Sequence, residues 1–179
     1  MKYHDALGPI AFIARIRVEG LRDLGSAPSP LNSFQVIQGL ETLEVRMQKH
    51  SENALELAHW LELREEVSWV NYPGLESSKY ADLAKEYLPN GKSGIVTFGL
   101  KKGFEAGKKL TESTNIFALL ANIGDTKSLI IHPSSTTHSQ LNEEEQKSTG
   151  VTPELVRLSV GIENLEDLKN DLDQALKSI

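Results

Sequence analysis

One arginine near the C-terminal end of the chain stands beside a run of apolar residues. Arg157 is followed by Leu158-Ser159-Val160, a run typical of a buried strand. A guanidinium in such a place must reach water or meet an anion, because a buried unpaired charge is very costly. Its planar group can bind a carboxylate through two parallel hydrogen bonds, which favours an amino-acid ligand. An internal salt bridge with a nearby glutamate explains the same residue equally well.

Other residues with chemical potential have spacings that argue against a site. His132 and His138 lack the helical zinc-binding spacing, and Pro133 lies between them, so we expect a structural turn. Gly91-Lys92-Ser93 resembles the end of a phosphate-binding loop, but Glu86 stands where that loop needs its first glycine. We expect a polar turn there and no metal site.

The last predicted helix carries three acidic residues, Asp167, Asp171 and Asp173. They alternate with a leucine stripe, so the pattern predicts a solvated face rather than a metal or acid–base site.

Composition excludes several classes of function. The chain has 179 residues, a net charge of −6, 39% hydrophobic residues and no cysteine. Disulfides, thiolate zinc sites and a cysteine nucleophile are therefore excluded. The negative charge gives no general reason to bind nucleic acid or an acidic membrane surface. The apolar segment 8–14 is too short to span a bilayer and lacks signal-peptide features. We expect a cytoplasmic protein with neither nucleic-acid nor membrane partners.

The first part of the chain predicts helices that connect domains. Residues 10–24 have helical periodicity, and the pattern favours a helix that faces a core. Ser29 before Pro30 predicts an N-cap. We expect a long helix over 30–65, bending near His50-Ser51, with a buried stripe of Phe34, Ile37, Leu40, Leu43, Met47, Ala54, Leu57, Ala58 and Leu61. We therefore assign residues 1–66 to connector helices.

Residues 67–179 predict an α+β domain. Strands are expected over 67–72, 95–100, 128–132 and 155–160, with a shorter strand or turn over 115–120. Helices are expected over 79–88, 104–113 and 165–176, and another after the N-cap residue Asn142. This order favours a mostly antiparallel sheet with helices on one face.

Two stretches of this domain, Ser128-Leu-Ile-Ile-His-Pro-Ser-Ser-Thr-Thr-His138 and Arg157-Leu-Ser-Val-Gly-Ile-Glu163, resemble a known family. They are similar to the pyridoxal-phosphate enzymes of cysteine and methionine metabolism, and among these to the O-acetylhomoserine sulfhydrylases. Ordered matches at 24–34, 38–43, 70–75, 87–89, 121–125 and 143–146 extend the similarity over nearly the whole chain. The resemblance implies the small C-terminal domain of an aspartate-aminotransferase-like, fold type I enzyme.

The resemblance also implies roles for particular residues. Arg157 is expected to bind the substrate α-carboxylate, Ser128 to lie beside it, and Thr137 to support the arginine. The family reaction replaces acetate on O-acetylhomoserine with sulfide and gives homocysteine. Lys127 does not match the position of the family's Schiff-base lysine, so we expect a structural role for it. Neither catalytic nor cofactor-binding residues are expected in this chain.

The family's cofactor-binding residues belong to an N-terminal domain that has no counterpart here, and Met1-Lys2-Tyr3-His4 begins within the family pattern. The resemblance thus implies a piece of a longer enzyme, a homo-oligomer when full length, that binds pyridoxal phosphate and an amino-acid substrate. Stable cofactor binding by this chain alone is not expected. Two alternatives remain open: a non-catalytic binding or oligomerisation module, and the C-terminal domain of a related γ-lyase or γ-synthase.

Overall fold

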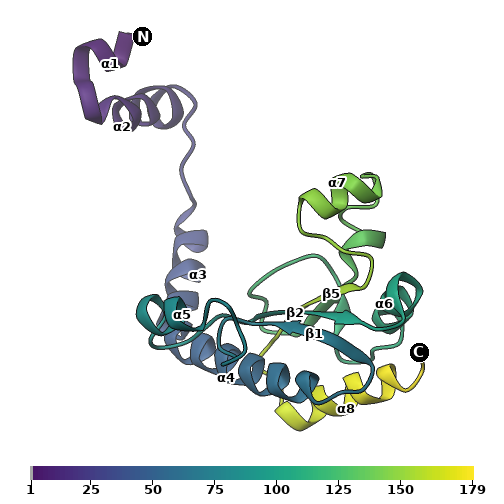
Figure 1. Ribbon diagram of the computed structural model, residues 1–179. Helices are drawn as coiled ribbons and strands as arrows, with labels where there is room; N and C mark the ends of the chain where they lie inside the picture. The colour runs from purple at the N-terminus through teal and green to yellow at the C-terminus, as the bar shows by residue number, and fades with distance from the viewer. Residues whose placement is uncertain (1) are drawn as a thin grey trace. The chain divides into compact units, whose positions relative to one another are not determined.

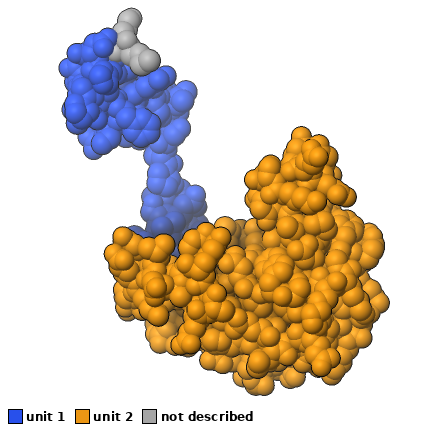
Figure 2. Space-filling view, viewed as in Figure 1, with its two compact units in different colours: residues 1–43 blue, residues 44–179 orange. Residues whose placement is uncertain are grey.

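The structure is a computed structural model that describes residues 2–179, and it divides into two compact units. Unit 1 comprises residues 1–43 and unit 2 residues 44–179 (Figure 2). Because the division falls at residue 43, the helix that follows it belongs with the sheet domain rather than with the first helices.

Unit 1 is a series of helical segments with no buried residue from Gly8 onwards in its helices. They are α1 (Lys2–Leu7), η1 (Gly8–Ile10), α2 (Ala11–Arg15), η2 (Ile16–Asp23), which is a π-helix, and α3 (Pro30–Glu41). The predicted N-cap is confirmed, since the Ser29 Oγ accepts a hydrogen bond from the Asn32 N–H at 3.1 Å. Ile13, Ile16 and Leu21 of the expected core-facing helix over 10–24 are each at least 50% exposed in this chain, so the contact of this helix with a core stays a prediction.

The expected single helix over 30–65 is also wrong, because it is interrupted at Thr42. There the backbone leaves helical geometry (φ −109°, ψ 8°), and α4 (Leu43–Glu62) starts directly afterwards. A β-branched threonine weakens a helix and is a natural place for the break. The predicted stripe is confirmed for Ala54, Leu57, Ala58 and Leu61, which are buried; its members Phe34, Ile37, Leu40, Leu43 and Met47 are exposed.

Unit 2 is built on a five-stranded sheet in the order β1-β2-β5-β4-β3. The strands are β1 (Val67–Asn71), β2 (Ile95–Leu100), β3 (Ala118–Leu119), β4 (Leu129–Ile131) and β5 (Leu155–Ser159). Only β3 and β4 pair in parallel; the other neighbours are antiparallel. The helices are α5 (Ala81–Tyr87), α6 (Gly103–Glu112), α7 (Glu143–Ser148) and α8 (Leu165–Leu176), with a 3₁₀ turn η3 (Pro133–Ser135). The predicted α+β class is therefore confirmed.

The core lies between one face of the sheet and helices α4, α6 and α8. The sheet contributes Val96, Phe98, Leu100, Ile130, Val156 and Leu158, and all six are at most 1% exposed. Figure 1 shows α4 and α8 running along the same side of the strands. Because side chains alternate along a strand, the residues between these core positions face the other side of the sheet.

The acidic residues of α8 correct the prediction of a solvated face. Asp171 is only 5% exposed, and its carboxylate accepts hydrogen bonds from the backbone N–H groups of Asn115 (2.8 Å), Ile116 (2.8 Å) and Phe117 (3.0 Å). Asp171 thereby fixes the turn that leads into β3.

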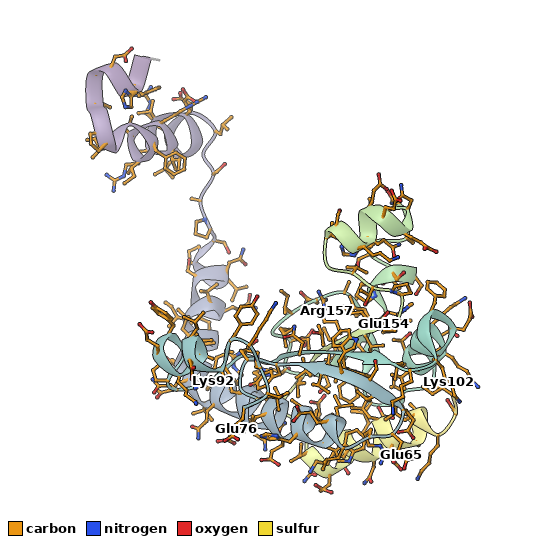
Figure 3. The ribbon with its side chains drawn as sticks, viewed as in Figure 1. Glu65, Glu76, Lys92, Lys102, Glu154 and Arg157 are labelled. Carbon is orange, nitrogen blue, oxygen red and sulfur yellow. The ribbon has the colours of Figure 1, made fainter. Side chains whose placement is uncertain are left out.

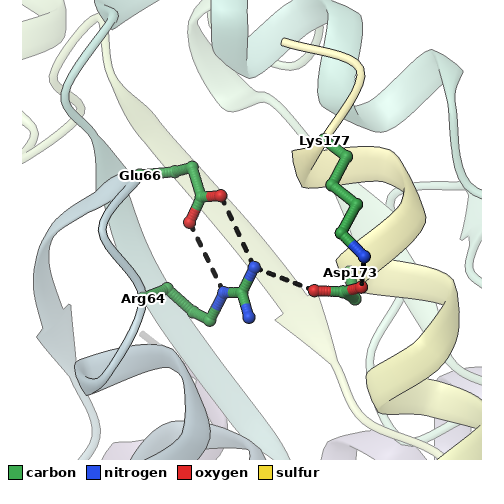
Figure 4. Close-up of polar contacts among 4 residues, drawn as sticks. All are labelled: Arg64, Glu66, Asp173 and Lys177. Atoms are coloured by element: carbon green, nitrogen blue, oxygen red, sulfur yellow. Dashed lines mark hydrogen bonds and ion pairs between the residues drawn. The ribbon is translucent and has the colours of Figure 1, made fainter.

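Asp173 takes part in a separate ion-pair network (Figure 4). Its carboxylate lies 2.8 Å from Arg64 Nη2 and 2.5 Å from Lys177 Nζ, and Arg64 also pairs with Glu66 at 3.4 Å. The hydrogen bond from Lys177 lowers the pKa of Asp173 below its ordinary value. The network ties the end of α4 to α8 and is structural.

Over residues 2–179, no helix has the length and apolar content needed to cross a bilayer.

Candidate carboxylate site

Arg157 lies on the sheet face opposite the helical core. Its neighbours along β5, Val156 and Leu158, are fully buried in that core, so Arg157 points to the other side. Its cross-strand neighbours on this face are Thr97 of β2 and Ile131 of β4. Figure 3 shows Arg157 on the side of the strands away from α4 and α8. The strand alternation therefore exposes a cation on the open side of the sheet.

The Arg157 guanidinium donates to a backbone carbonyl rather than to a carboxylate. Its Nη2 lies 3.3 Å from the Asn122 oxygen. Within the described residues Arg157 forms no ion pair. The internal salt bridge that the sequence left open is thus absent from residues 2–179.

A loop of residues 120–128 contacts Arg157, and it is anchored along the end of β5. The Gly124 N–H donates to Ser159 Oγ at 3.2 Å, and the Ile162 N–H donates to the Thr126 oxygen at 2.9 Å. Gly124 has φ +73°, a conformation that favours glycine. These contacts hold the loop beside Arg157.

Ser128 closes the far end of this loop. It is 0% exposed, and its Oγ donates to Glu163 Oε2 at 2.9 Å while accepting from the Gly161 N–H at 2.8 Å. Its backbone N–H donates to Glu163 Oε1 at 2.6 Å. Because both functions of the hydroxyl are used, Ser128 acts as an anchor in this structure. Direct substrate contact by Ser128 stays a prediction.

Helix α4 supports the same corner from the core side. The His50 Nδ1 lies 2.6 Å from the Val160 oxygen, and the Asn53 Nδ2 donates to the oxygens of Gly161 (3.0 Å) and Glu163 (2.9 Å). Gly161 is required there, since a Cβ at this position would lie 2.3 Å from Glu163 Oε2 and 2.5 Å from the Thr126 oxygen. The segment after β5 is therefore fixed on two sides.

Thr137 contacts His138 rather than Arg157. It is exposed, and its Oγ1 lies 2.9 Å from His138 Nδ1. Its support of the arginine stays a prediction.

His132 is fully buried and structural, as predicted. Its ring nitrogens contact Ser135 Oγ (2.9 Å) and the Pro153 oxygen (2.7 Å), and burial lowers its pKa below the ordinary value. No metal-ligand cluster is found among the described residues.

The open hollow next to α6 and α7 does not include Arg157. It is lined by Phe104, Leu141 and Pro153, with Ser134 and Gln146 among its polar residues. The last two bind each other, Ser134 Oγ to Gln146 Oε1 at 2.6 Å. The charged side chains of Lys108 and Glu143 also line the hollow.

Sequence reasoning missed Asn122, Ser159, Glu163, His50 and Asn53. Four of them act on backbone groups 35 or more positions away, and Asn122 acts through its own carbonyl. Such partners leave no spacing signal in a single sequence. In the sequence, only the polar residues within the apolar run 156–160 indicated that such partners exist.

A family model described as "Cys/Met metabolism PLP-dependent enzyme" matches residues 8–177. The chain belongs to this family. Among curated family relatives, O-acetyl-L-homoserine sulfhydrylase 1 of Thermus thermophilus is 49% identical over 176 residues, which cover 98% of this chain and 42% of that protein. O-acetyl-L-homoserine sulfhydrylase of Leptospira meyeri is 55% identical over 171 residues, covering 95% and 39%.

A solved structure shares the fold of this Cys/Met metabolism domain. It is a Campylobacter jejuni chain named O-acetylhomoserine (thiol)-lyase, which contains N′-pyridoxyl-lysine-5′-monophosphate. The TM-score is 0.84 at 47% identity, over 94% of this chain and 40% of that chain. This chain thus spans about two fifths of the length of its relatives. The predicted family and fold are confirmed.

Among residues 3–179, the lysine environments do not match what the family's cofactor requires. Pyridoxal phosphate is held through a lysine Schiff base in an enclosed pocket. No lysine side chain among residues 3–179 is buried, and Lys127 is exposed.

Proposed function

We propose that this chain is the substrate-carboxylate part of a pyridoxal-phosphate-dependent O-acetylhomoserine sulfhydrylase. One observation carries the proposal: Arg157 holds an unpaired guanidinium on the open sheet face, in a chain 49% and 55% identical to two proteins of that name. The whole reaction would convert O-acetylhomoserine and sulfide to homocysteine and acetate. The remaining, larger part of the protein would supply the Schiff-base lysine and the cofactor's chemistry.

The role of Arg157 follows from its hydrogen-bonding capacity. One N–H group is used by the Asn122 carbonyl, and the others remain available for two parallel bonds to a carboxylate. The rigid sheet fixes the base of the side chain, and the loop carbonyl fixes its tip. Such pre-organisation lets binding at the carboxylate orient the reacting end of the substrate. In this proposal Ser128 anchors the loop and Thr137 supports the site from the side.

Reconstitution tests the proposal. The chain, supplied with the remainder of the protein in one polypeptide or as two parts, should form homocysteine from O-acetylhomoserine only when sulfide is added. Arg157→Ala should lower kcat/KM by at least about 100-fold, because charged hydrogen bonds contribute about 1.5–3 kcal/mol each and two are lost, about 3 kcal/mol or more in total. Lys85→Ala, a charge removal on the exposed face of α5, is the matched control and should leave kcat/KM unchanged.

The alternative of a non-catalytic binding module has its own supporting observation. Unit 1 exposes large apolar residues, among them Phe12 at 73%, Leu24 at 79% and Leu31 at 64%. Such a surface is typical of a region that another protein part covers. Homocysteine formation that disappears in Arg157→Ala would eliminate this alternative, whereas a well-folded reconstituted protein without turnover would favour it.

A further inference from the structure

Ser159 is a buried hydroxyl to which the proposed substrate binding gives no role. It is 3% exposed and lies two residues after Arg157 on the same strand, so both side chains face the same side of the sheet. Its Oγ accepts the hydrogen bond of the Gly124 N–H at 3.2 Å. The hydroxyl therefore reaches across to the loop that contacts the arginine.

Because Ser159 holds this loop, the loop in turn restricts the position of the Arg157 side chain. Asn122, whose carbonyl receives the guanidinium, is two residues before Gly124. Residues 120–128 contain neither helix nor strand, and residues 121–124 are exposed, so few local contacts define their position. On the other side of Gly124 the next anchor is the Thr126 oxygen, bound by the Ile162 N–H at 2.9 Å. The Asn122 N–H makes only a local bond, to the Leu120 oxygen at 3.2 Å. Apart from the arginine's own bond, the Ser159 hydroxyl is therefore the contact nearest to the Asn122 carbonyl that ties the loop to β5.

We propose that Ser159 is a positioning residue for carboxylate binding: it holds the 122–124 loop so that the Asn122 carbonyl aims the guanidinium of Arg157. The inference rests on the proposed function of Arg157. Without the Ser159 hydroxyl, Gly124 swings free and the arginine samples more rotamers. Substrate binding then has to order both, which raises KM and leaves the chemical step largely unchanged.

The first test uses this chain alone and does not depend on activity. In Ser159→Ala, hydrogen exchange of the Gly124 amide should accelerate by about tenfold relative to the wild-type chain, as expected for loss of one hydrogen bond. Ser159→Thr should restore slow exchange, because it retains the hydroxyl. Ser77→Ala removes an exposed hydroxyl elsewhere and serves as the control. Unchanged Gly124 exchange in Ser159→Ala would overturn the anchor.

The second test uses the reconstituted enzyme. Ser159→Ala should raise KM for O-acetylhomoserine about three- to tenfold with kcat nearly unchanged, and Ser159→Thr should recover most of the loss. Ser159→Cys fills the space of the serine side chain but is a weaker hydrogen-bond acceptor. It should therefore raise KM as Ser159→Ala does, and it provides the test if the alanine variant folds poorly. A wild-type KM in both Ser159→Ala and Ser159→Cys, together with a raised KM in Arg157→Ala, would overturn the positioning role alone. If Arg157→Ala also retained a wild-type KM, the proposed function itself would fail.

Discussion

The buried carboxylate of Asp171 should contribute strongly to the stability of this chain. Its two oxygens accept three backbone N–H groups, from Asn115, Ile116 and Phe117, at 2.8–3.0 Å, and a side-chain N–H of Gln174 at 3.2 Å. We expect Asp171→Ala to unfold the turn before β3, because no other side chain takes over these donors.

The magnitude follows from which donors become unpaired. The Phe117 N–H is buried, and leaving such a group without a partner costs about 1–3 kcal/mol. The other two N–H groups belong to exposed residues that water can reach, so each loses only the net value of a hydrogen bond, about 0.5–1.5 kcal/mol. Asp171→Ala should therefore cost about 2–6 kcal/mol, a large fraction of the stability of a typical domain.

Urea unfolding followed by tryptophan fluorescence measures this cost. With a slope of about 2 kcal/mol per molar urea, the midpoint of Asp171→Ala should fall by about 1–3 M. Asp167→Ala removes an exposed aspartate from the same helix, and its cost should remain below about 1 kcal/mol. Equal midpoints for the two variants would refute the assignment of Asp171 as the anchor of this turn.

Three further changes test other parts of unit 2. Burial raises the pKa of Tyr72 to about 12, so its stabilisation is complete below pH 10 and is lost as the pH rises through about 12; Tyr72→Phe should remove this alkaline loss in unfolding curves. Burial lowers the pKa of His132, so stability should fall as the pH drops below about 6.5, and His132→Asn should flatten that slope. Ser93 has φ 101°, a backbone conformation that favours glycine. The free energy of unfolding of Ser93→Gly should therefore exceed that of Ser93→Ala by about 1 kcal/mol, because both variants lose the hydroxyl but only alanine keeps the strained Cβ.

The sequence predicted the sheet domain well because its elements carry local signals. The β-branched run of β2 and the leucine stripe of α8 matched the structure residue for residue, at 95–100 and 165–176. Asn142 was expected to cap α7, and its side chain accepts from the N–H groups of Glu144 and Glu145, both at 3.0 Å. In these places propensity, capping and burial agree.

The errors have a shared physical origin in contacts that a periodicity does not encode. Apolar periodicity in α3 predicted burial, but in this chain nothing covers Phe34 or Ile37. Asp171 looked solvated because its partners are 54 to 56 positions away in sequence. Arg157 was recognised from its type within an apolar strand, whereas the loop that orients it depends on backbone groups without a sequence signature.

Binding of the substrate α-carboxylate by Arg157 can be tested with a substrate that lacks this group. In the reconstituted enzyme, kcat/KM would be measured for O-acetylhomoserine and for its decarboxylated analogue, 3-acetoxypropylamine, with the wild-type chain and with Arg157→Ala. We predict that the variant loses about 100-fold on O-acetylhomoserine and less than about twofold on the analogue, because only the carboxylate interaction is removed. Equal losses on both substrates would contradict a role for Arg157 in carboxylate recognition.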